Sequence, residues 1–433
     1  MSSFEIIGGK SLSGIITPQG SKNEALQVIS ACLLTSEKVE IKNVPEITDV
    51  LNLIKLLRLI GVKVTRKKIN HFIFQAKNID KDYFKKEKFQ KLSSKIRGSI
   101  MIMGPLVSRE GKAHVITPGG DKIGRRPLDT HFKGLENLGA KIKIEKNNIY
   151  QVTGKKLIGK NMLLEEASVT ATANIIMAST LAKGKTEIYN AACEPYIQQL
   201  CKMLNSMGAK ITGSGTNLIK IEGVENLSGT SHKILPDMIE IGSWIGLAVM
   251  TQSNITIKDC SINNLGVILD VFRKIGVKIK TKKDDIIIKK QKTHEIHTFM
   301  NGSVLTISDA PWPGFTPDLI SIILVLATQA KGSILIHQKM FESRLFFVDK
   351  LIDMGAKIIL CDPHRATVVG INREYNLKGT TMSSPDIRAG IALLIAALSA
   401  KGKSVIHNIN QIDRGYENIV ERLQKIGAKI KRT

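Results

Sequence analysis

The stretch TPGGDKIGRRP, residues 117–127, sets one acid, Asp121, beside a glycine pair and close to Lys122, Arg125 and Arg126. A carboxyl group in a loop can donate a proton when its pKa rises towards neutrality, which burial promotes and neighbouring cations oppose. A Gly-Gly-Asp sequence is also suited to an ordinary surface turn. The residues therefore allow two interpretations of Asp121, a proton carrier or a turn residue, and leave both open.

Further polar residues stand where long apolar helices are expected to begin. They are Lys22 with Asn23, Arg97, and Ser168 with Val169 and Thr170 in the first half of the chain, and Asp237, Asp318 and Asp386 in the second. A cation at a helix N-terminus opposes the helix dipole, so Lys22 and Arg97 suggest that an anion binds there. Helix capping is enough to explain Asp237. Asp318 follows the unusual loop PWPGFTPD, which favours a role in a site.

Two interleaved repeats indicate which elements carry these residues. The first ends an amphipathic stretch at a glycine and continues into a β-branched stretch, as at Gly61, Gly139, Gly208, Gly276, Gly355 and Gly427, with spacings of 68 to 79 residues. This pattern predicts a helix ended by glycine in a left-handed conformation, and then a strand. The second, as in LAKGKTEI and SAKGKSVI, ends stretches rich in small apolar residues. Each repeat is thus predicted to run strand, helix, strand, helix, strand, strand.

Six such repeats predict an α/β protein of two domains, each built from three units around a pseudo-threefold core. The helices rich in small residues are expected to be buried and the more charged ones to lie outside. The first domain is predicted to span residues 22–235. The second is predicted to combine residues 1–21 with 236–433, because FEIIGG and SGIITP look like strands that complete its sheets.

Composition limits the class of protein. Of 433 residues, 43% are hydrophobic and 23% are charged, which is typical of a globular chain. Apolar runs such as LISIILVLA at 319–327 are too short to span a bilayer, and the N-terminus has no export pattern, so a cytoplasmic protein is expected. Five scattered cysteines predict neither a disulfide framework nor a zinc site. The net charge of +25 fits an anionic partner, but a genome-wide drift towards lysine explains it equally well.

Seven segments, in order along the chain, resemble one family. They are SKNEALQV, IRGSIMIMGPLV, TPGGDKIGRRPLDTH, WPGFTPD, MFESRLFF, SSPDIRAG and QIDRGYENI. Together they are similar to the UDP-N-acetylglucosamine enolpyruvyl transferases. The resemblance implies two inverse α/β barrel-like domains of three βαβαββ units each. It also implies transfer of the enolpyruvyl group of phosphoenolpyruvate to the 3-hydroxyl of UDP-N-acetylglucosamine, the first committed step of peptidoglycan synthesis, without a metal or cofactor.

The same resemblance implies a role for individual residues. Those expected around the phosphate of phosphoenolpyruvate are Lys22, Arg126 and Arg414, and those near its carboxylate are Arg344 and Arg388. Those expected to contact the nucleotide sugar are Asn23, Arg97, Arg126, Pro127, Leu128, Asp129, Thr130, Ser168, Val169, Asp318 and Met340. Addition followed by elimination needs a general acid and a general base, for which Asp121 and Asp318 are the candidates. Several guanidinium groups also suit two substrates that both carry negative charge.

The sequence departs from the commonest family pattern at two positions. Most members have cysteine where this chain has Asp121, and many have lysine where it has Glu166. Because fosfomycin alkylates that cysteine, an aspartate at this position predicts resistance. An acid at Glu166 cannot pair with a diphosphate, so its role is left open.

Three other interpretations share some of these features. The sister family that makes the shikimate-derived product shares the fold and the phosphoenolpyruvate clamp, but PGGDKIGRRPLDTH favours a nucleotide sugar as acceptor. RNA 3′-terminal phosphate cyclases use related units, but no matching histidine context is present. A ring of six basic units could encircle DNA, yet such a clamp has no use for acids and arginines at helix starts. The predicted partners are therefore two small-molecule substrates, with no nucleic acid and no membrane, and the oligomeric state is left open.

Overall fold

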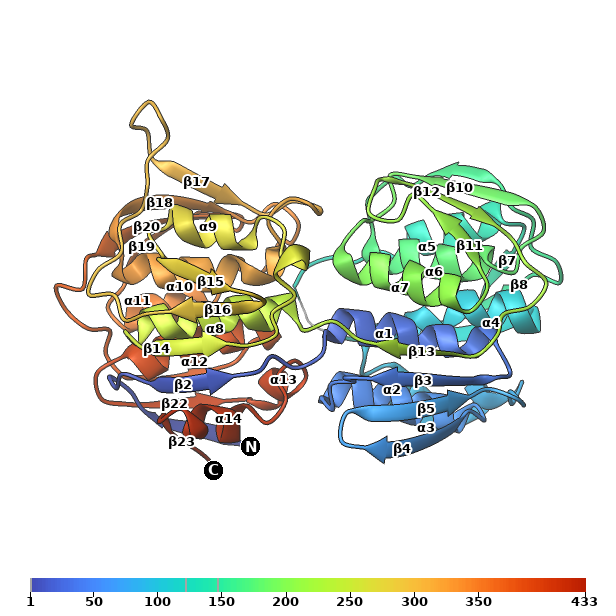
Figure 1. Cartoon of the computed structure of the whole chain (residues 1–433), viewed down its shortest axis with the longest axis horizontal. Helices are drawn as coiled ribbons and strands as arrows, with labels where there is room; N and C mark the ends of the chain where they lie inside the picture. The colour runs from blue at the N-terminus through green and yellow to red at the C-terminus, as the bar shows by residue number, and fades with distance from the viewer. Residues whose placement is uncertain (1, 121–122, 146–147) are drawn as a thin grey trace. The chain divides into compact units, whose positions relative to one another are not determined.

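Figure 1 shows the computed structural model of the chain, which describes residues 2–120, 123–145 and 148–433. These residues form two compact units. Unit 1 holds residues 2–19, 123–125 and 236–433, and unit 2 holds residues 20–120 and 126–235. Within the described residues, no helix is both long enough and apolar enough to cross a membrane.

Each unit contains three small sheets. In unit 2 their strands, in sheet order, are β13 (Thr230–Lys233), β3 (Lys38–Lys42), β5 (His71–Gln75) and β4 (Lys63–Lys68); β6 (Lys112–Ile116), β8 (Ile149–Thr153) and β7 (Lys141–Glu145); and β11 (Lys210–Thr212), β12 (Leu218–Glu222), β10 (Lys185–Tyr189) and β9 (Asn161–Leu163). In unit 1 they are β15 (Ile279–Lys282), β16 (Asp285–Ile288), β14 (Asn254–Ile257) and β2 (Ser13–Ile16); β17 (Leu305–Ser308), β18 (Lys331–His337), β20 (Arg365–Ile371) and β19 (Lys357–Asp362); and β21 (Thr381–Ser383), β22 (Lys403–His407), β1 (Ser3–Ile7) and β23 (Lys429–Arg432).

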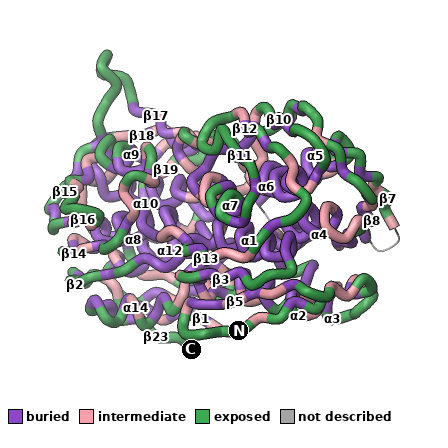
Figure 2. Tube along the Cα trace, turned by 45° about the vertical axis from the view of Figure 1, so that its right-hand side comes forward, coloured by how far each residue is buried: buried purple, intermediate pink, exposed green. Residues whose placement is uncertain are grey.

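Two kinds of helix accompany these sheets. The buried ones are α1 (Lys22–Ala31), η3 (Arg97–Ile102) with α4 (Met103–Glu110), and α6 (Val169–Ser179) in unit 2, and α8 (Met238–Met250), η6 (Pro317–Leu319) with α10 (Ile320–Gln329), and α12 (Ile387–Ser399) in unit 1. The outer ones are α2 (Thr48–Leu59), α5 (Asp129–Asn137), α7 (Pro195–Ser206), α9 (Ile268–Lys274), α11 (Val348–Asp353), α13 (Asn410–Asp413) and α14 (Ile419–Lys425). Figure 2 shows the buried residues along α8, α10 and α12. The predicted difference between buried and outer helices is confirmed.

The predicted order of strands and helices along the chain is confirmed in full in four of the six repeats, and in the sixth β1 from the start of the chain takes the place of the last strand. In three of the four-stranded sheets the strand that precedes the buried helix pairs in parallel with the strand that follows it, as β9 does with β10, β17 with β18 and β21 with β22. In the other two sheets the preceding strands are exchanged: β2, which precedes α1, pairs in parallel with β14 after α8, and β13, which precedes α8, pairs in parallel with β3 after α1. The second repeat differs from the prediction. In its described residues, the segment between β5 and η3 holds the 3₁₀-helix η2 (Tyr83–Lys85) and the helix α3 (Glu87–Ser93) instead of a strand.

The glycine signature has the expected backbone conformation. All the glycines that end the outer helices have φ between +84° and +103°: Gly61, Gly139, Gly208, Gly276, Gly355 and Gly427. Open space surrounds the Cβ position of Gly139, so left-handed backbone rather than crowding favours glycine there. Gly246 is different, because a Cβ there would lie 2.5 Å from Ile322, and its absence lets α8 approach α10 closely.

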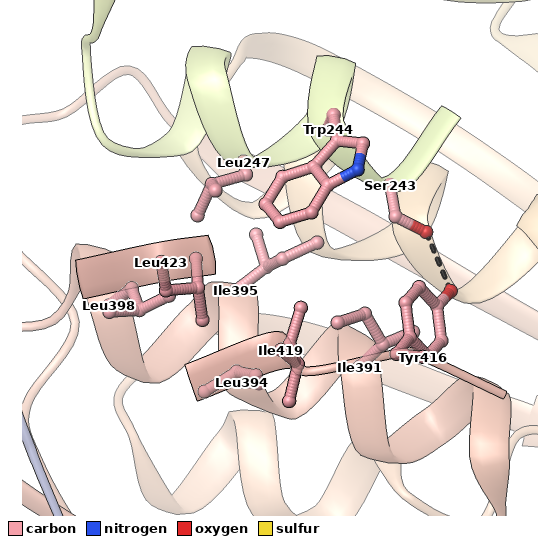
Figure 3. Close-up of a pocket in the computed structure, with 10 residues that line it drawn as sticks. All are labelled: Ser243, Trp244, Leu247, Ile391, Leu394, Ile395, Leu398, Tyr416, Ile419 and Leu423. Atoms are coloured by element: carbon pink, nitrogen blue, oxygen red, sulfur yellow. Dashed lines mark hydrogen bonds between the residues drawn. The ribbon is translucent and has the colours of Figure 1, made fainter. Parts of the chain in front are cut away.

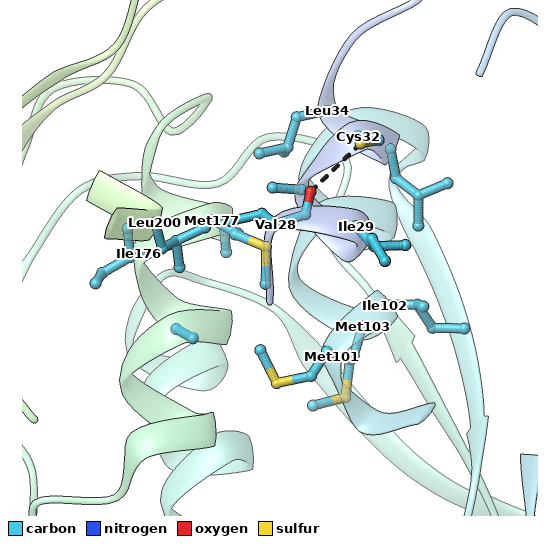
Figure 4. Packing of buried hydrophobic residues seen from close by; sticks show 14 of the residues in the cluster. Val28, Ile29, Cys32, Leu34, Met101, Ile102, Met103, Ile176, Met177 and Leu200 are labelled. Carbon is cyan, nitrogen blue, oxygen red and sulfur yellow. Dashed lines mark hydrogen bonds between the residues drawn. The ribbon is translucent and has the colours of Figure 1, made fainter. Parts of the chain in front are cut away.

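The core of each unit forms where its buried helices meet. In unit 1, α8, α10 and α12 contact one another pairwise. Figure 4 shows part of the core of unit 2, where Val28 and Ile29 of α1 pack near Met101, Met103 and Met177. Burying this apolar surface supplies the main driving force for folding.

The strands at the N-terminus join sheets formed by later parts of the chain. Strand β1 pairs antiparallel with both β22 and β23, and β2 pairs in parallel with β14. The prediction that FEIIGG and SGIITP complete sheets alongside the second half of the chain is confirmed.

Candidate active site

In unit 1, Asp318 is held between two buried guanidinium groups. Arg344 Nη2 lies 2.7 Å from Asp318 Oδ1, while Arg388 Nε and Nη2 lie 3.0 and 2.9 Å from Oδ2. The side chains of Arg344 and Arg388 are only 10% and 7% exposed. Both contacts are charge-assisted hydrogen bonds. Three residues that the sequence proposed for one site are therefore in direct contact.

Local sequence explains how these residues reach one another. Thr316, not Asp318, caps the turn η6, since its hydroxyl accepts from the N–H of Asp318 at 3.4 Å. Asp386 caps α12 by accepting from the N–H groups of Arg388 and Ala389. The Asp318 side chain is thus left for the arginines, whereas Asp386 fixes the first turn of the helix that carries Arg388. The prediction that Asp237 is a helix cap is confirmed for α8.

Arg388 has a second buried neighbour, Tyr416. Its Nη1 lies 3.5 Å from the Tyr416 hydroxyl, which lies 2.8 Å from Ser243 Oγ (Figure 3). Burial alone would disfavour the charged guanidinium, but Asp318, Tyr416 and Asp237 together outweigh this effect and raise the pKa of Arg388 above its ordinary value. Burial raises the pKa of Tyr416 to about 12, so its phenol keeps its proton. Arg388 is therefore a permanent cation held from two sides.

Arg344 offers donors that its neighbours do not use. Within the part of the chain that the structure describes, its buried Nε and Nη1 have no hydrogen-bond partner. Its guanidinium lies 4.7 Å from the centre of the Phe341 ring, which supports the plane of the group. Buried donors without partners are unfavourable unless a ligand satisfies them. The geometry thus suits a planar anion such as a carboxylate.

In unit 2, Lys22 stands at the first position of α1 and pairs with Asp49. Its Nζ lies 2.8 Å from Asp49 Oδ2, and the two side chains are 10% and 6% exposed. Asp49 belongs to the first turn of α2. The cation at this helix start therefore already has a protein counter-charge, and a bound anion is not its whole explanation.

Arg97 gathers several of the residues proposed for the nucleotide sugar. Its Nη2 donates to the carbonyl oxygens of Arg126 at 2.7 Å and Pro127 at 3.5 Å. Burial and the nearby charge of Arg126 lower the pKa of Arg97 to about 10, against an opposing effect of Glu166. The Glu166 carboxylate accepts from the Thr130 hydroxyl at 3.3 Å. The Glu166 carboxylate is therefore close enough to Arg97 for an electrostatic interaction between the two side chains.

A buried polar network lies next to this cluster. His131 Nδ1 accepts from Asn174 Nδ2 at 3.0 Å, which leaves the proton on Nε2 for the hydroxyl of Thr170, also at 3.0 Å. Asn174 Oδ1 accepts from the N–H of Gly104 at 2.8 Å. The network joins α4, α5 and α6 and so fixes the start of α6, where Ser168 and Val169 lie.

The free energy of unfolding should decrease as the pH falls from 7 to 5, partly because of His131. Burial lowers the pKa of His131 to about 3, whereas an unfolded histidine binds a proton below about pH 6.5. The unfolded state then binds more protons, so the free energy of unfolding falls as the pH falls. At pH 5 this histidine alone should account for about 2 kcal/mol, measured by urea denaturation at both pH values.

The control for this prediction compares His131→Gln with His297→Gln, which removes an exposed histidine. The first variant should lose less stability than the parent on going from pH 7 to pH 5. The second should follow the parent. Equal pH dependence in all three proteins would contradict the assignment to His131.

The remaining predicted residues are less closely connected. Arg414 follows α13 and donates to Gln411 Oε1 at 2.7 Å. Met340 is exposed, Asn23 is half-buried on α1, and Asp129 is exposed at the start of α5, next to the buried Leu128. Ser168 occupies the N-cap position of α6 without a capping bond from its side chain in the described structure. Asp121 lies outside the described residues.

Sequence reasoning missed several neighbours of these groups. The sequence did not indicate Asp49 or Glu240 as ion-pair partners. Asp49 pairs with Lys22 and Glu240 pairs with Arg422, and both pairs join residues that are far apart in the sequence. Tyr416 lies within the recognised segment QIDRGYENI but had no assigned role. Among the described residues, no cluster of three or more histidine, cysteine, aspartate or glutamate side chains could hold a metal ion.

Comparison with known proteins places the chain in a family. A family model described as EPSP synthase (3-phosphoshikimate 1-carboxyvinyltransferase) matches residues 6–423. Two proteins named UDP-N-acetylglucosamine 1-carboxyvinyltransferase, from Bacteroides thetaiotaomicron and Porphyromonas gingivalis, are 62% and 60% identical over 433 residues, with 100% of both chains covered in each case. The chain belongs to the UDP-N-acetylglucosamine 1-carboxyvinyltransferases of the EPSP synthase family.

The fold agrees with this membership. The crystal structure of the enolpyruvyl transferase NikO from Streptomyces tendae superposes with a TM-score of 0.88 at 23% identity and covers 100% of this chain and 99% of its own. The predicted two-domain α/β fold is confirmed. A member of the UDP-N-acetylglucosamine 1-carboxyvinyltransferases is an enzyme, so the DNA-encircling clamp is wrong, and the full-length relatives separate the chain from the sister family that acts on a shikimate.

Proposed function

We propose that this enzyme transfers the enolpyruvyl group of phosphoenolpyruvate to the 3-hydroxyl of UDP-N-acetylglucosamine and releases phosphate. The observation that carries the proposal is the cluster of Asp318, Arg344 and Arg388, in which a carboxylate is held by two buried cations and Arg344 has unused donors. The names of the full-length relatives supply the identity of the substrates.

In this proposal the carboxylate of phosphoenolpyruvate replaces the Asp318 carboxylate as a partner of the arginines. Both oxygens of Asp318 are engaged by guanidinium groups in the structure. The carboxylate of phosphoenolpyruvate would occupy the free donors of Arg344 and draw the guanidinium towards it. This frees an oxygen of Asp318, which can then accept the proton of the sugar hydroxyl as general base. Lys22, Arg126 and Arg414 would bind the phosphate.

The nucleotide sugar would bind along unit 2. Arg97 is half-buried, and its buried donor Nε lacks a partner in the described residues, which suits an incoming diphosphate. The N-terminus of α6, at Ser168 and Val169, presents backbone N–H groups to the same ligand. Asn23, Leu128 and Asp129 complete the proposed contacts of unit 2, and Met340 is a further proposed contact from unit 1. The units would then act as two enolpyruvyl transferase domains, residues 22–235 and residues 1–21 with 236–433.

Asp121 is the proposed general acid, which protonates C3 of phosphoenolpyruvate while the sugar hydroxyl attacks C2. A carboxylic acid can replace the cysteine of most relatives in this step if closure of the loop desolvates it. The product fits peptidoglycan synthesis in the cytoplasm, and the proposed steps involve no metal or cofactor.

Phosphate release tests the proposed function. The purified enzyme should release phosphate from phosphoenolpyruvate only when UDP-N-acetylglucosamine is present. Shikimate 3-phosphate in place of the nucleotide sugar should give no release, which separates the two related activities. Release that does not depend on the nucleotide sugar would refute the proposal.

Limited trypsin digestion tests whether ligand binding closes the loop at residues 117–127. Arg125 is exposed, and its backbone N–H lies 3.4 Å from Glu342 Oε2. Saturating UDP-N-acetylglucosamine should slow cleavage after Arg125 several-fold, because a closed loop is less available to a protease. Cleavage after the exposed Lys88 of α3 serves as the internal control. An unchanged ratio of the two cleavages would count against closure.

A further inference from the structure

Asp309 is a fully buried acid to which the proposed reaction gives no task. It follows β17 directly, and its side chain is 0% exposed. Burial raises the pKa of Asp309, an effect that hydrogen bonds from the N–H groups of Lys339 and Met340 oppose. A buried carboxyl group is costly unless several donors satisfy it.

Three donors to Asp309 come from one short segment. Gln338 Nε2 and the backbone N–H groups of Lys339 and Met340 donate to its two oxygens, the last at 3.1 Å. This segment, residues 338–344, follows β18 and ends at Arg344. The carbonyl and N–H of Gln338 are in turn bonded to His364, at 2.9 and 2.7 Å. The base of the segment is therefore held from two sides.

The position of Asp309 between two loops gives these bonds a consequence. Strands β17 and β18 are parallel neighbours that end together at Ser308 and His337. The loop after β17 leads to Asp318, and the loop after β18 leads to Arg344. Asp309 belongs to the first loop and binds the second, so it fixes the relative position of the two partners in the Asp318–Arg344 ion pair.

We propose that Asp309 is a positioning residue that holds the segment 338–344 so that Arg344 presents its free donors to the carboxylate of phosphoenolpyruvate. This inference rests on the proposed function for the identity of the ligand. The anchoring of the segment by Asp309 is a property of the folded chain, and this part of the inference is independent of the proposed function.

The variant Asp309→Asn tests the proposal. An amide keeps the size of the side chain but offers one acceptor oxygen and directs an NH₂ group at a donor, so at least one of the three bonds is lost. The KM for phosphoenolpyruvate should rise about tenfold, the size expected for the loss of one hydrogen bond to a carboxylate. The KM for UDP-N-acetylglucosamine should change less than about twofold. A purely structural defect would lower the active fraction and leave both KM values unchanged.

Hydrogen exchange gives a readout that does not need turnover. Amide exchange of the peptide containing Lys339 and Met340 should become at least tenfold faster in Asp309→Asn, because at least one of the two amides loses its acceptor. Asp284→Asn is the matched control, since Asp284 accepts from the N–H groups of Ser261 and Ile262 at 2.9 and 2.8 Å in another repeat. That variant should leave exchange at 338–344 and both KM values unchanged.

The outcomes separate the two proposals. A parent enzyme without turnover, together with faster exchange in Asp309→Asn, would refute the function and keep the anchor. Unchanged exchange and unchanged KM in Asp309→Asn would overturn the anchor. If Asp309→Asn does not fold, Gln338→Leu removes one donor only, and it should raise exchange and the KM for phosphoenolpyruvate two- to threefold. The absence of any change in Gln338→Leu would then overturn the anchor.

Discussion

Replacing Asp318 with asparagine is expected to lower kcat by about 10² to 10⁴-fold, the range for loss of a general base. The amide cannot take the proton of the sugar hydroxyl. It also removes the negative charge between Arg344 and Arg388, which leaves both guanidinium groups available to an incoming anion. The KM for phosphoenolpyruvate should therefore stay unchanged or fall. Steady-state phosphate release at varied phosphoenolpyruvate measures both parameters.

Asp270→Asn is a suitable control for this variant. Asp270 forms an exposed ion pair with Arg273 on α9, at 2.7 Å, and exposed pairs contribute little. Its kcat should match that of the parent. A kcat for Asp318→Asn within threefold of the parent would exclude Asp318 as the base, and a raised KM with normal kcat would assign it to binding alone.

Asp121→Asn should lower kcat by a similar factor of about 10² to 10⁴, because the amide cannot protonate the vinyl carbon. Asp121→Cys should instead retain turnover and become inactivated by fosfomycin over time. The thiolate opens the epoxide, whereas a carboxylate is a far poorer nucleophile towards it. Residual activity after timed exposure to fosfomycin distinguishes the two proteins.

The parent enzyme is its own control in that experiment, since it carries an exposed thiol at Cys361. It should keep its activity in fosfomycin, which would show that an accessible cysteine elsewhere is not sufficient. Time-dependent inactivation of the parent would refute predicted resistance. Full turnover of Asp121→Asn would remove Asp121 from the mechanism.

Features with a local cause were predictable from the sequence. The glycines that end the outer helices require a left-handed backbone whatever surrounds them, so one repeated residue reports a conformation. Asp237 caps its helix through N–H groups two and three residues away. The second repeat differs from this rule, because its segment between β5 and η3 folds into η2 and α3 where the repeat pattern predicted a strand.

The candidate site was predictable in its residue types but not in its contacts. The motifs indicated Asp318, Arg344 and Arg388, yet their mutual ion pairs join positions 26 and 70 residues apart. Lys22 suggested a bound anion, and its partner Asp49 emerges only when α1 and α2 pack together. Asp309 carries no signal at all in the sequence, since its function depends on two parallel strands ending side by side.

The pairing of β1 with β23 has a consequence for biosynthesis. Phe4 lies opposite Arg432, so the sheet that contains β1 cannot be completed until more than 400 further residues have been synthesised. At translation rates of about 5–20 residues per second, β1 stays without its neighbour for roughly 20–90 s. The segment 20–235, by contrast, holds all the strands of its own sheets and can fold while the ribosome is still making the other half.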